Sequence, residues 1–267
     1  MTTTGQDIIR QSTVIASAVF MLIAAAVGGG AFGGESVSQL QDGALSAEGS
    51  YLAPAGPAFA IWSLIYLGLA AYTIWQALPG QRENSRQRAA GYWVAASMVV
   101  NGLWLVTARY LNLVLTVIVI AALLVVLART IVLLGRRRAA DALELTLFDA
   151  VMGLHFGWVT IATVANTGAW LTQTLPAGMT EQADAWGIAV LVVVAAIGAL
   201  SALITRRLAP ALATSWGLIW LAVGRFGGEP ESTPIGVVAI IAAVVILVAG
   251  VIGLLRARRS SADRTAV

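Results

Sequence analysis

The sequence contains no cysteine and no lysine, and its only histidine is His155. Without cysteine the chain can form neither a disulfide, a thiolate nucleophile nor a cysteine-ligated metal site. One histidine is too few for the histidine clusters that bind zinc. We therefore expect no metal centre and no obligatory cofactor.

Charge is also scarce. Only 11% of the 267 residues are charged, whereas 59% are hydrophobic. A soluble domain typically has about 25% charged residues. A surface this poor in charge indicates that lipid surrounds most of the chain, and the sequence contains the apolar runs of about 20 residues that a bilayer crossing needs.

These runs predict an all-α integral membrane protein with eight spanning segments. The predicted segments are 11–31, 56–78, 90–108, 111–134, 147–171, 185–205, 209–225 and 234–255.

All 16 basic residues are arginines, and most lie in alternate connections between these segments. The connections 32–55 and 172–184 instead contain acidic residues and no arginine, and only Arg109 and Arg225 fall on their side. By the positive-inside rule both termini are cytoplasmic and 32–55 is an outer loop. We expect an integral protein of a bacterial inner (plasma) membrane. A nucleic-acid-binding face would cluster its basic residues on one element, so we expect no nucleic-acid partner.

Residues 1–34 allow a second interpretation. Arg10, the apolar stretch after it and the run GGGAFGG could form a cleaved signal peptide. Asp7 beside Arg10 and the length of the apolar run favour a retained first span.

The fifth segment contains GLHFGWVTIATVAN, which has more polar and aromatic residues than a lipid-facing helix needs. Trp158, Ala162, Asn166 and Trp170 recur at every fourth residue and therefore share one helical stripe. Two further pairs share a helical face in the same way: Trp62 with Tyr66, and Asn101 with Trp104.

The predicted direction of each segment gives the depth of these residues. Most are expected in the outer half of the membrane, and His155 nearer the cytoplasmic side. An asparagine is costly in lipid without a partner, so each should face the bundle interior. The simplest interpretation is that Asn101 and Asn166 bond each other or a nearby carbonyl, and that a neutral His155 bonds a backbone carbonyl. The alternative is a ligand site, because ionisable groups within a membrane are often functional.

The spacing W-x3-A-T-x2-N-x3-W, from Trp158 to Trp170, resembles the last helix of the TspO/MBR family, the tryptophan-rich sensory or translocator proteins. N-x2-W at Asn101 resembles the family's third-helix motif, and PAGPAFAIWSLIYLGLAAYTIW resembles its second helix. The three motifs occur in the family's order. The sequence departs from the family at Leu154-His155, where a Pro-Tyr pair is expected, and at Ala108-Arg109, where paired aromatics are expected.

The resemblance implies a five-helix core over residues 1–171, often a homodimer. It does not cover residues 172–267, where the apolar runs predict a three-helix membrane extension that ends in a short arginine-rich tail. It implies porphyrin- or haem-like flat ligands, bound beneath the loop 32–55 for sensing, scavenging or transport rather than catalysis. The predicted ligand-binding residues are Phe59, Trp62, Tyr66, Asn101, Trp104, His155, Trp158, Ala162, Asn166 and Trp170. Of these, Phe59 and Trp170 are assigned to the rim and His155 to a secondary contact.

Three alternatives remain open. A secondary transporter of a small lipophilic molecule would need buried charges, and the spans offer few beyond Arg109, Arg129 and Asp149 near their ends. A membrane enzyme that modifies a porphyrin or a lipid would need an acid–base pair or a nucleophile, and no such motif is recognisable. A structural subunit could use its last three helices to dock a partner protein.

Overall fold

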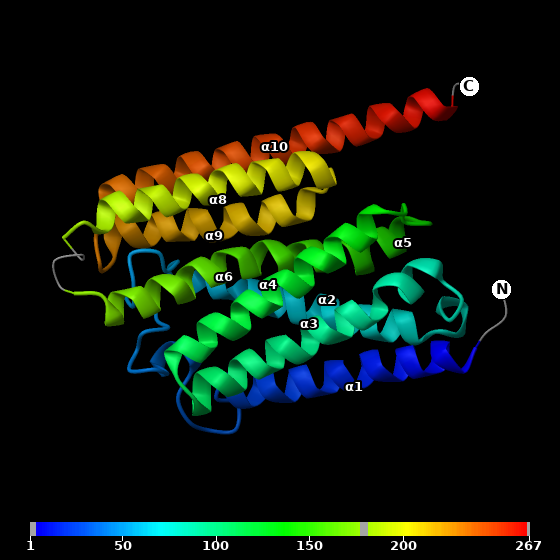
Figure 1. The fold of residues 1–267 in the computed structure, drawn as a ribbon, viewed down its shortest axis with the longest axis horizontal. Coiled ribbons are helices and arrows are strands. Elements are labelled where there is room, and N and C mark those ends of the chain that lie inside the picture. The colour runs from blue at the N-terminus through cyan, green and yellow to red at the C-terminus, as the bar shows by residue number, and fades with distance from the viewer. Residues whose placement is uncertain (1–3, 177–180, 266–267) are drawn as a thin grey trace.

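The computed structural model describes residues 4–176 and 181–265, and all regular structure in this part of the chain is helical (Figure 1). The first group of helices is α1 (Gly5–Gly28), α2 (Ile61–Ala77), α3 (Ser85–Tyr110), α4 (Leu113–Gly135), α5 (Ala142–Glu144), the π-helical turn η4 (Leu145–Ala150) and α6 (Val151–Thr174). The second group is α8 (Ala183–Thr205), α9 (Leu208–Gly227) and α10 (Thr233–Thr265). Short 3-10 turns η1 (Val37–Gln39), η2 (Gly56–Ala60) and η3 (Pro79–Gln81) lie in the connections.

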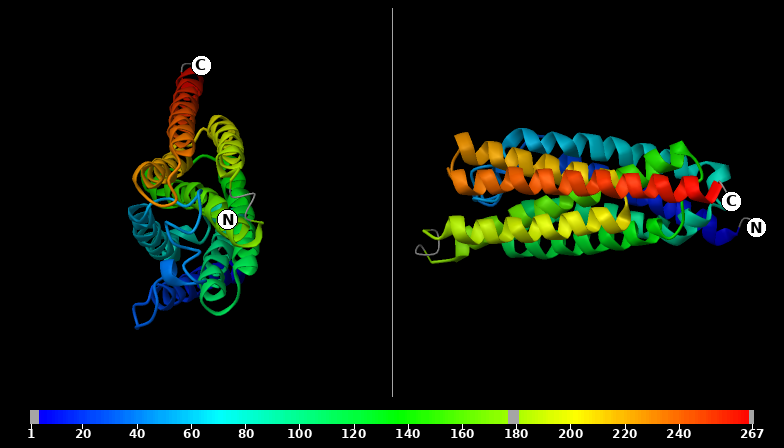
Figure 2. Two further views of the ribbon diagram at one scale, coloured as in Figure 1. Left: turned by 90° about the vertical axis from the view of Figure 1, so that its left-hand side faces the viewer. Right: turned by 90° about the horizontal axis from the view of Figure 1, so that it is seen from above.

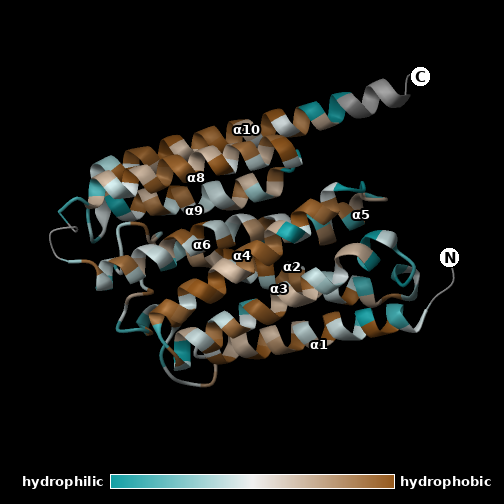
Figure 3. Ribbon diagram, viewed as in Figure 1, coloured by the Kyte–Doolittle hydropathy of each residue, from teal (hydrophilic) through white to brown (hydrophobic). Residues whose placement is uncertain are grey.

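Each predicted span corresponds to a long helix. Seven helical stretches in the described residues are long and apolar enough to cross a membrane. The eighth predicted span corresponds to α9, a helix of 20 residues that is not among these seven. Hydrophobic residues lie mainly in the middle of the helices, and hydrophilic residues lie mainly at the helix ends and in the connections (Figure 3). The prediction of an all-α membrane protein is confirmed.

The helix ends differ from the predicted segment ends where polar residues continue a helix. Helix α1 begins at Gly5 rather than at residue 11, because the backbone N–H and the hydroxyl of Thr4 both donate to the Asp7 carboxylate at 3.0 Å. The first of these bonds satisfies the Thr4 N–H, which has no partner within the helix. Hydropathy cannot detect such a turn, because its residues are polar.

The helices form two groups that lie side by side, with α8, α9 and α10 next to the group from α1 to α6 (Figures 1 and 2). Both described ends of the chain lie at one end of the bundle, which we call the termini end. The connection between α1 and α2, which contains residues 32–55, lies at the opposite end, the loop end. Helix α9 joins the two groups by packing against α6.

Glycine allows α6 and α9 to approach closely. A Cβ atom added at Gly157 of α6 would lie 2.9 Å from the Cβ of Ala213 and 3.0 Å from the carbonyl carbon of Pro210, both on α9. Side chains essentially cannot approach at these distances, and the Pro210 backbone cannot rotate away. The two groups of helices therefore pack at a distance that only glycine permits at this position.

We accordingly expect Gly157→Ala to lower the free energy of unfolding by about 1–3 kcal/mol, the usual cost of overpacking. The measurement is unfolding in mixed detergent and sodium dodecyl sulfate, followed by circular dichroism. Gly135→Ala is the matched control, because no atom lies within 4 Å of its added Cβ and alanine favours a helix. Equal stability of both variants and the wild type would contradict the close α6–α9 contact.

The structure buries more charge than the sequence pattern led us to expect. Six charged side chains are buried in the described part of the chain. They lie near helix ends, where hydrogen bonds and ion pairs compensate the loss of water. They are Asp7, Arg10, Arg86, Glu144, Asp149 and Arg225.

Four charged side chains form an ionic cluster at the termini end. Arg86 of α3 donates to both carboxylate oxygens of Asp149 at 2.8 Å and pairs with Glu144 at 3.2 Å. Arg207, which precedes α9, also pairs with Asp149. The cluster therefore connects α3, the turn η4 and the start of α9, and it links both groups of helices far from the loop end.

Candidate functional site

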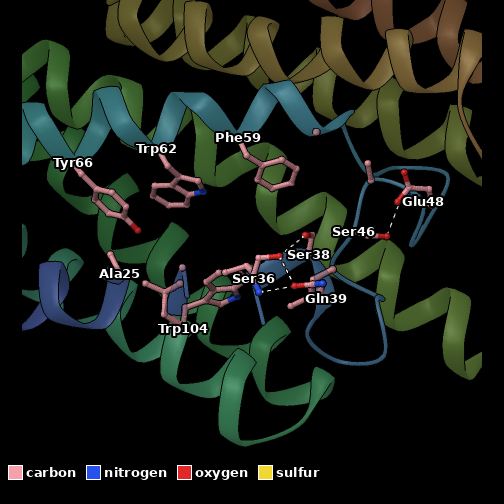
Figure 4. A pocket seen from close by; sticks show the side chains of 16 residues that line it. Ala25, Ser36, Ser38, Gln39, Ser46, Glu48, Phe59, Trp62, Tyr66 and Trp104 are labelled. Carbon is pink, nitrogen blue, oxygen red and sulfur yellow. Dashed lines mark hydrogen bonds between the residues drawn. The ribbon is translucent and has the colours of Figure 1, made fainter. Parts of the chain in front are cut away.

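A cavity of about 680 Å³ lies at the loop end. Its walls come from α1, α2 and α3 and from the connection between α1 and α2. Figure 4 shows Phe59, Trp62 and Tyr66 projecting toward Trp104 and toward the loop residues. Its lining comprises Ala25, Gly29, Ser36, Val37, Ser38, Gln39, Leu45, Ser46, Ala47, Glu48, Gly56, Phe59, Trp62, Tyr66, Trp104 and Leu105.

The aromatic wall follows from helical spacing. Phe59, at the end of η2, and Trp62 and Tyr66 of α2 are separated by three and four residues, so they share one face. The rings of Trp62 and Tyr66 are stacked, with centroids 5.3 Å apart and planes 19° from parallel. Phe59 meets the ring of Trp158 edge-on, with centroids 5.6 Å apart. Ring contacts within the wall and with Trp158 of α6 therefore hold these side chains in place.

A narrower space of about 40 Å³ adjoins the cavity and reaches α6. It shares Phe59, Trp62 and Trp104 with the cavity lining. Its lining from α6 consists of Trp158, Ala162, Ala165 and Asn166. The structure therefore brings seven of the ten predicted ligand-binding residues to these two connected spaces: Phe59, Trp62, Tyr66, Trp104, Trp158, Ala162 and Asn166.

The two asparagines cross-link helices beside the cavity. The indole Nε1 of Trp104 donates to Oδ1 of Asn166 at 3.2 Å, and Nδ2 of Asn166 donates to the carbonyl of Ala162 at 3.0 Å. The hydroxyl of Tyr66 donates to Oδ1 of Asn101 at 3.2 Å. Asn101 and Asn166 therefore do not bond each other. Each orients an aromatic residue of the cavity wall instead, because each meets an N–H or O–H group from another helix.

Three predicted residues lie outside both linings. Asn101 is buried behind Tyr66, and Trp170 packs against the hydrophobic core near Trp104. His155 is fully buried, with its ring edge toward Trp62 and centroids 5.9 Å apart. The expected bond from His155 to a backbone carbonyl is not found, because neither ring nitrogen has a hydrogen-bond partner among the described residues.

Most of the lining residues that sequence reasoning missed lie in the loop. Ser36 donates through its backbone N–H to Oε1 of Gln39 at 2.9 Å, and its hydroxyl lies 2.9 Å from that of Ser38. Within the described lining, Glu48 is the one charged side chain. Irregular loops have no periodic pattern, so the family resemblance pointed to the loop 32–55 as a whole but not to its individual lining residues.

No group of three or more acidic or histidine side chains among the described residues is placed to hold a metal ion. The arrangement can surround a ligand with aromatic rings on one side and hydroxyl and amide groups on the other. Fold and site together define an α-helical integral membrane protein with an aromatic-lined cavity under a loop at one end of its bundle.

The chain belongs to the family whose model is described as TSPO-like protein, which it matches over residues 9–252. The matched range includes α8, α9 and α10 as far as residue 252. Membership supports a membrane-associated role in ligand binding or transport. Searches of curated proteins and of solved structures found no match.

Proposed function

We propose that the protein binds porphyrin- or haem-like flat hydrophobic molecules in the cavity at the loop end, for sensing, scavenging or transport and without catalysis. The observation that carries the proposal is the aromatic wall of Phe59, Trp62 and Tyr66 facing Trp104 across a space of about 680 Å³. Cavities of about 300–1,000 Å³ with mostly apolar linings are typical of small-molecule sites.

The chemistry of the wall favours a flat ligand. Indole and phenol rings are large, rigid and amphipathic, so they bury a flat ring system at a low cost in conformational entropy. The hydroxyl and amide groups of Ser36, Ser38 and Gln39 can donate hydrogen bonds to polar groups at the ligand's edge. Glu48 would repel a carboxylate, so we expect the acidic edge of a porphyrin to lie nearer the serines.

The orientation in the membrane follows from the arginines. Because arginine-rich connections mark the cytoplasmic side, the termini end would face the cytoplasm and the cavity would open to the outside. A bacterial inner membrane would then present the cavity to periplasmic or extracellular ligands. Reaction of impermeant reagents with single cysteines placed at each end of the bundle in intact cells tests this orientation.

The decisive experiment is a titration of the purified, detergent-solubilised protein with protoporphyrin IX and haemin, followed by tryptophan fluorescence quenching and by the porphyrin absorption band. Palmitate, which is apolar but linear, is the comparison ligand. We expect saturable binding in the low-micromolar range or tighter for the flat ligands, the range that about −8 kcal/mol corresponds to. Binding that does not saturate, or equal affinity for palmitate, would contradict the proposal. Light scattering on the same sample measures whether the protein is the homodimer that the resemblance implies.

A second candidate, ion-coupled transport of a small lipophilic molecule, is supported by the ionic cluster of Arg86, Glu144, Asp149 and Arg207, of which the first three are buried. Buried ionisable groups in membrane proteins are a usual means of coupling ion movement to substrate movement. Reconstitution into liposomes tests this function. Protoporphyrin flux that exceeds that of protein-free liposomes and depends on a pH gradient would support transport, and binding without such flux would favour sensing or scavenging.

A further inference from the structure

The cavity is covered by an irregular segment, residues 44–54, which we call the roof segment. Leu45, Ser46, Ala47 and Glu48 of this segment line the cavity, and Ala53 and Pro54 line the narrower space. No regular helix occurs between residues 40 and 55. Where an irregular segment is buried from water, its backbone carbonyls must find partners within the protein.

Arg225 of α9 supplies such partners. The side chain is only 1% exposed, and its guanidinium donates to two carbonyl oxygens of the roof segment, those of Ala47 and Ser50, each at 3.2 Å. It also donates to the carbonyls of Pro230 at 2.6 Å and Glu229 at 3.3 Å, in the connection to α10. The planar fork of five N–H groups on arginine can bridge separate carbonyls in this way.

Neighbouring contacts attach the same region to the second group of helices. The backbone N–H of Ala55 donates to the carbonyl of Trp220 at 3.0 Å. The indole Nε1 of Trp216 donates to the carbonyl of Ala58 at 2.9 Å. None of the described residues of α8, α9 or α10 lines the cavity or the narrower space. These helices therefore contact the roof segment from the side away from the ligand site.

An arginine in the last turn of a helix often only caps that helix. The bonds from Arg225 to Glu229 and Pro230 fit that ordinary role. The bonds to Ala47 and Ser50 do not, because these residues precede Arg225 by more than 170 positions and belong to the cavity's cover.

We propose that Arg225 is a positioning residue through which the second group of helices holds the roof segment over the cavity and thereby sets how fast a ligand enters and leaves. The statement about ligand exchange rests on the proposed binding function. The statement about the roof segment does not, and it can be tested without a ligand.

The absence of cysteine from the chain permits a clean reporter of roof opening. Leu45 belongs to the roof segment, is only 9% exposed and packs into the hydrophobic core below the segment. A cysteine introduced by Leu45→Cys would therefore react with a bulky maleimide faster when the segment lifts. In this background we expect Arg225→Gln to speed labelling at least about tenfold, because hydrogen bonds from a charged group are lost.

Arg109→Gln is the matched control. Arg109 donates to the carbonyl of Glu35 at 3.1 Å, near the start of the same loop. It is only half-buried, and this bond lies outside the roof segment. We expect this variant to leave the labelling rate within about twofold of the parent. An unchanged rate in folded Arg225→Gln, or an equal increase in Arg109→Gln, would overturn the proposal.

Trp216→Phe provides a second test if Arg225→Gln fails to fold. It keeps an aromatic ring and removes one neutral hydrogen bond to Ala58, so we expect about threefold faster labelling. If Arg225→Gln does not fold and Trp216→Phe labels at the parental rate, the proposal is overturned.

The dissociation rate of protoporphyrin IX separates the two proposals. A wild-type protein that binds no porphyrin contradicts the proposed function and leaves the labelling result to decide the role of Arg225. If the wild type binds porphyrin, we expect dissociation from Arg225→Gln to be at least about fivefold faster, following the roof opening. If labelling is faster but the dissociation rate is unchanged, the statement that Arg225 controls ligand exchange is overturned, and the statement that it holds the roof segment stands.

Discussion

Replacing Trp104 and Asn166 together by alanine is expected to weaken protoporphyrin IX binding by about thirtyfold, or about 2 kcal/mol, while leaving the bundle folded. The two residues form one unit, because the Trp104 indole donates to Asn166 at 3.2 Å and both line the space beside the aromatic wall. Removing the indole of Trp104 deletes the aromatic face opposite Trp62. Removing the amide of Asn166 deletes the group that orients this indole and a polar group of the narrower space.

The affinity should be read from the porphyrin absorption band, because loss of a tryptophan also changes the amplitude of fluorescence quenching. Trp93→Ala is the control, since Trp93 lies on the same helix but outside both linings. We expect it to bind porphyrin as the wild type does. An unchanged affinity in the folded double variant would show that these residues only hold α3 and α6 together.

The second large effect concerns stability. Asp149→Asn is expected to lower the free energy of unfolding by about 3–5 kcal/mol, the usual cost of removing one partner from a buried ionic cluster. Asp149 is 4% exposed and accepts hydrogen bonds from both Arg86 and Arg207. Asparagine has nearly the same shape but no negative charge, so it leaves two guanidinium groups with only Glu144 to compensate them.

Detergent unfolding followed by circular dichroism measures this change. Asp42→Asn is the control, because Asp42 is exposed in the loop, and we expect a change within about 0.5 kcal/mol there. A stability of Asp149→Asn within that same range would contradict the structural importance of the cluster. The porphyrin affinity of the folded variant should be unchanged, since distant sites usually act independently.

The spanning segments and the aromatic wall were both predictable because they depend on local periodicity. Runs of about 20 apolar residues predict helices that cross a bilayer. The separations between Phe59, Trp62 and Tyr66 predict a shared face on any helix, whatever that helix packs against. The motifs around Asn101 and Trp158 also led to the correct family.

The partners of the polar residues were not predictable in the same way. Asn101 and Asn166 were expected to bond each other or a carbonyl, and Asn166 does donate to the carbonyl of Ala162. The contacts that were not foreseen are those with Tyr66 and Trp104 on other helices. His155 was expected to bond a carbonyl and has no partner among the described residues. Such contacts depend on helix rotation and spacing, which no single segment specifies.

The amino-acid sequence by itself determined which segments are helical, that they enter a membrane, and which aromatic residues share a face, because backbone hydrogen bonding and hydropathy act along the chain. Only the tertiary structure decided which residues of the loop 32–55 line the cavity and that Arg225 bonds the loop backbone from the second group of helices. It also decided that Arg86, Asp149 and Arg207 meet at the termini end. These contacts join residues far apart in the sequence, and they form only when packed helices bring buried polar groups within reach of the partners that compensate their loss of water.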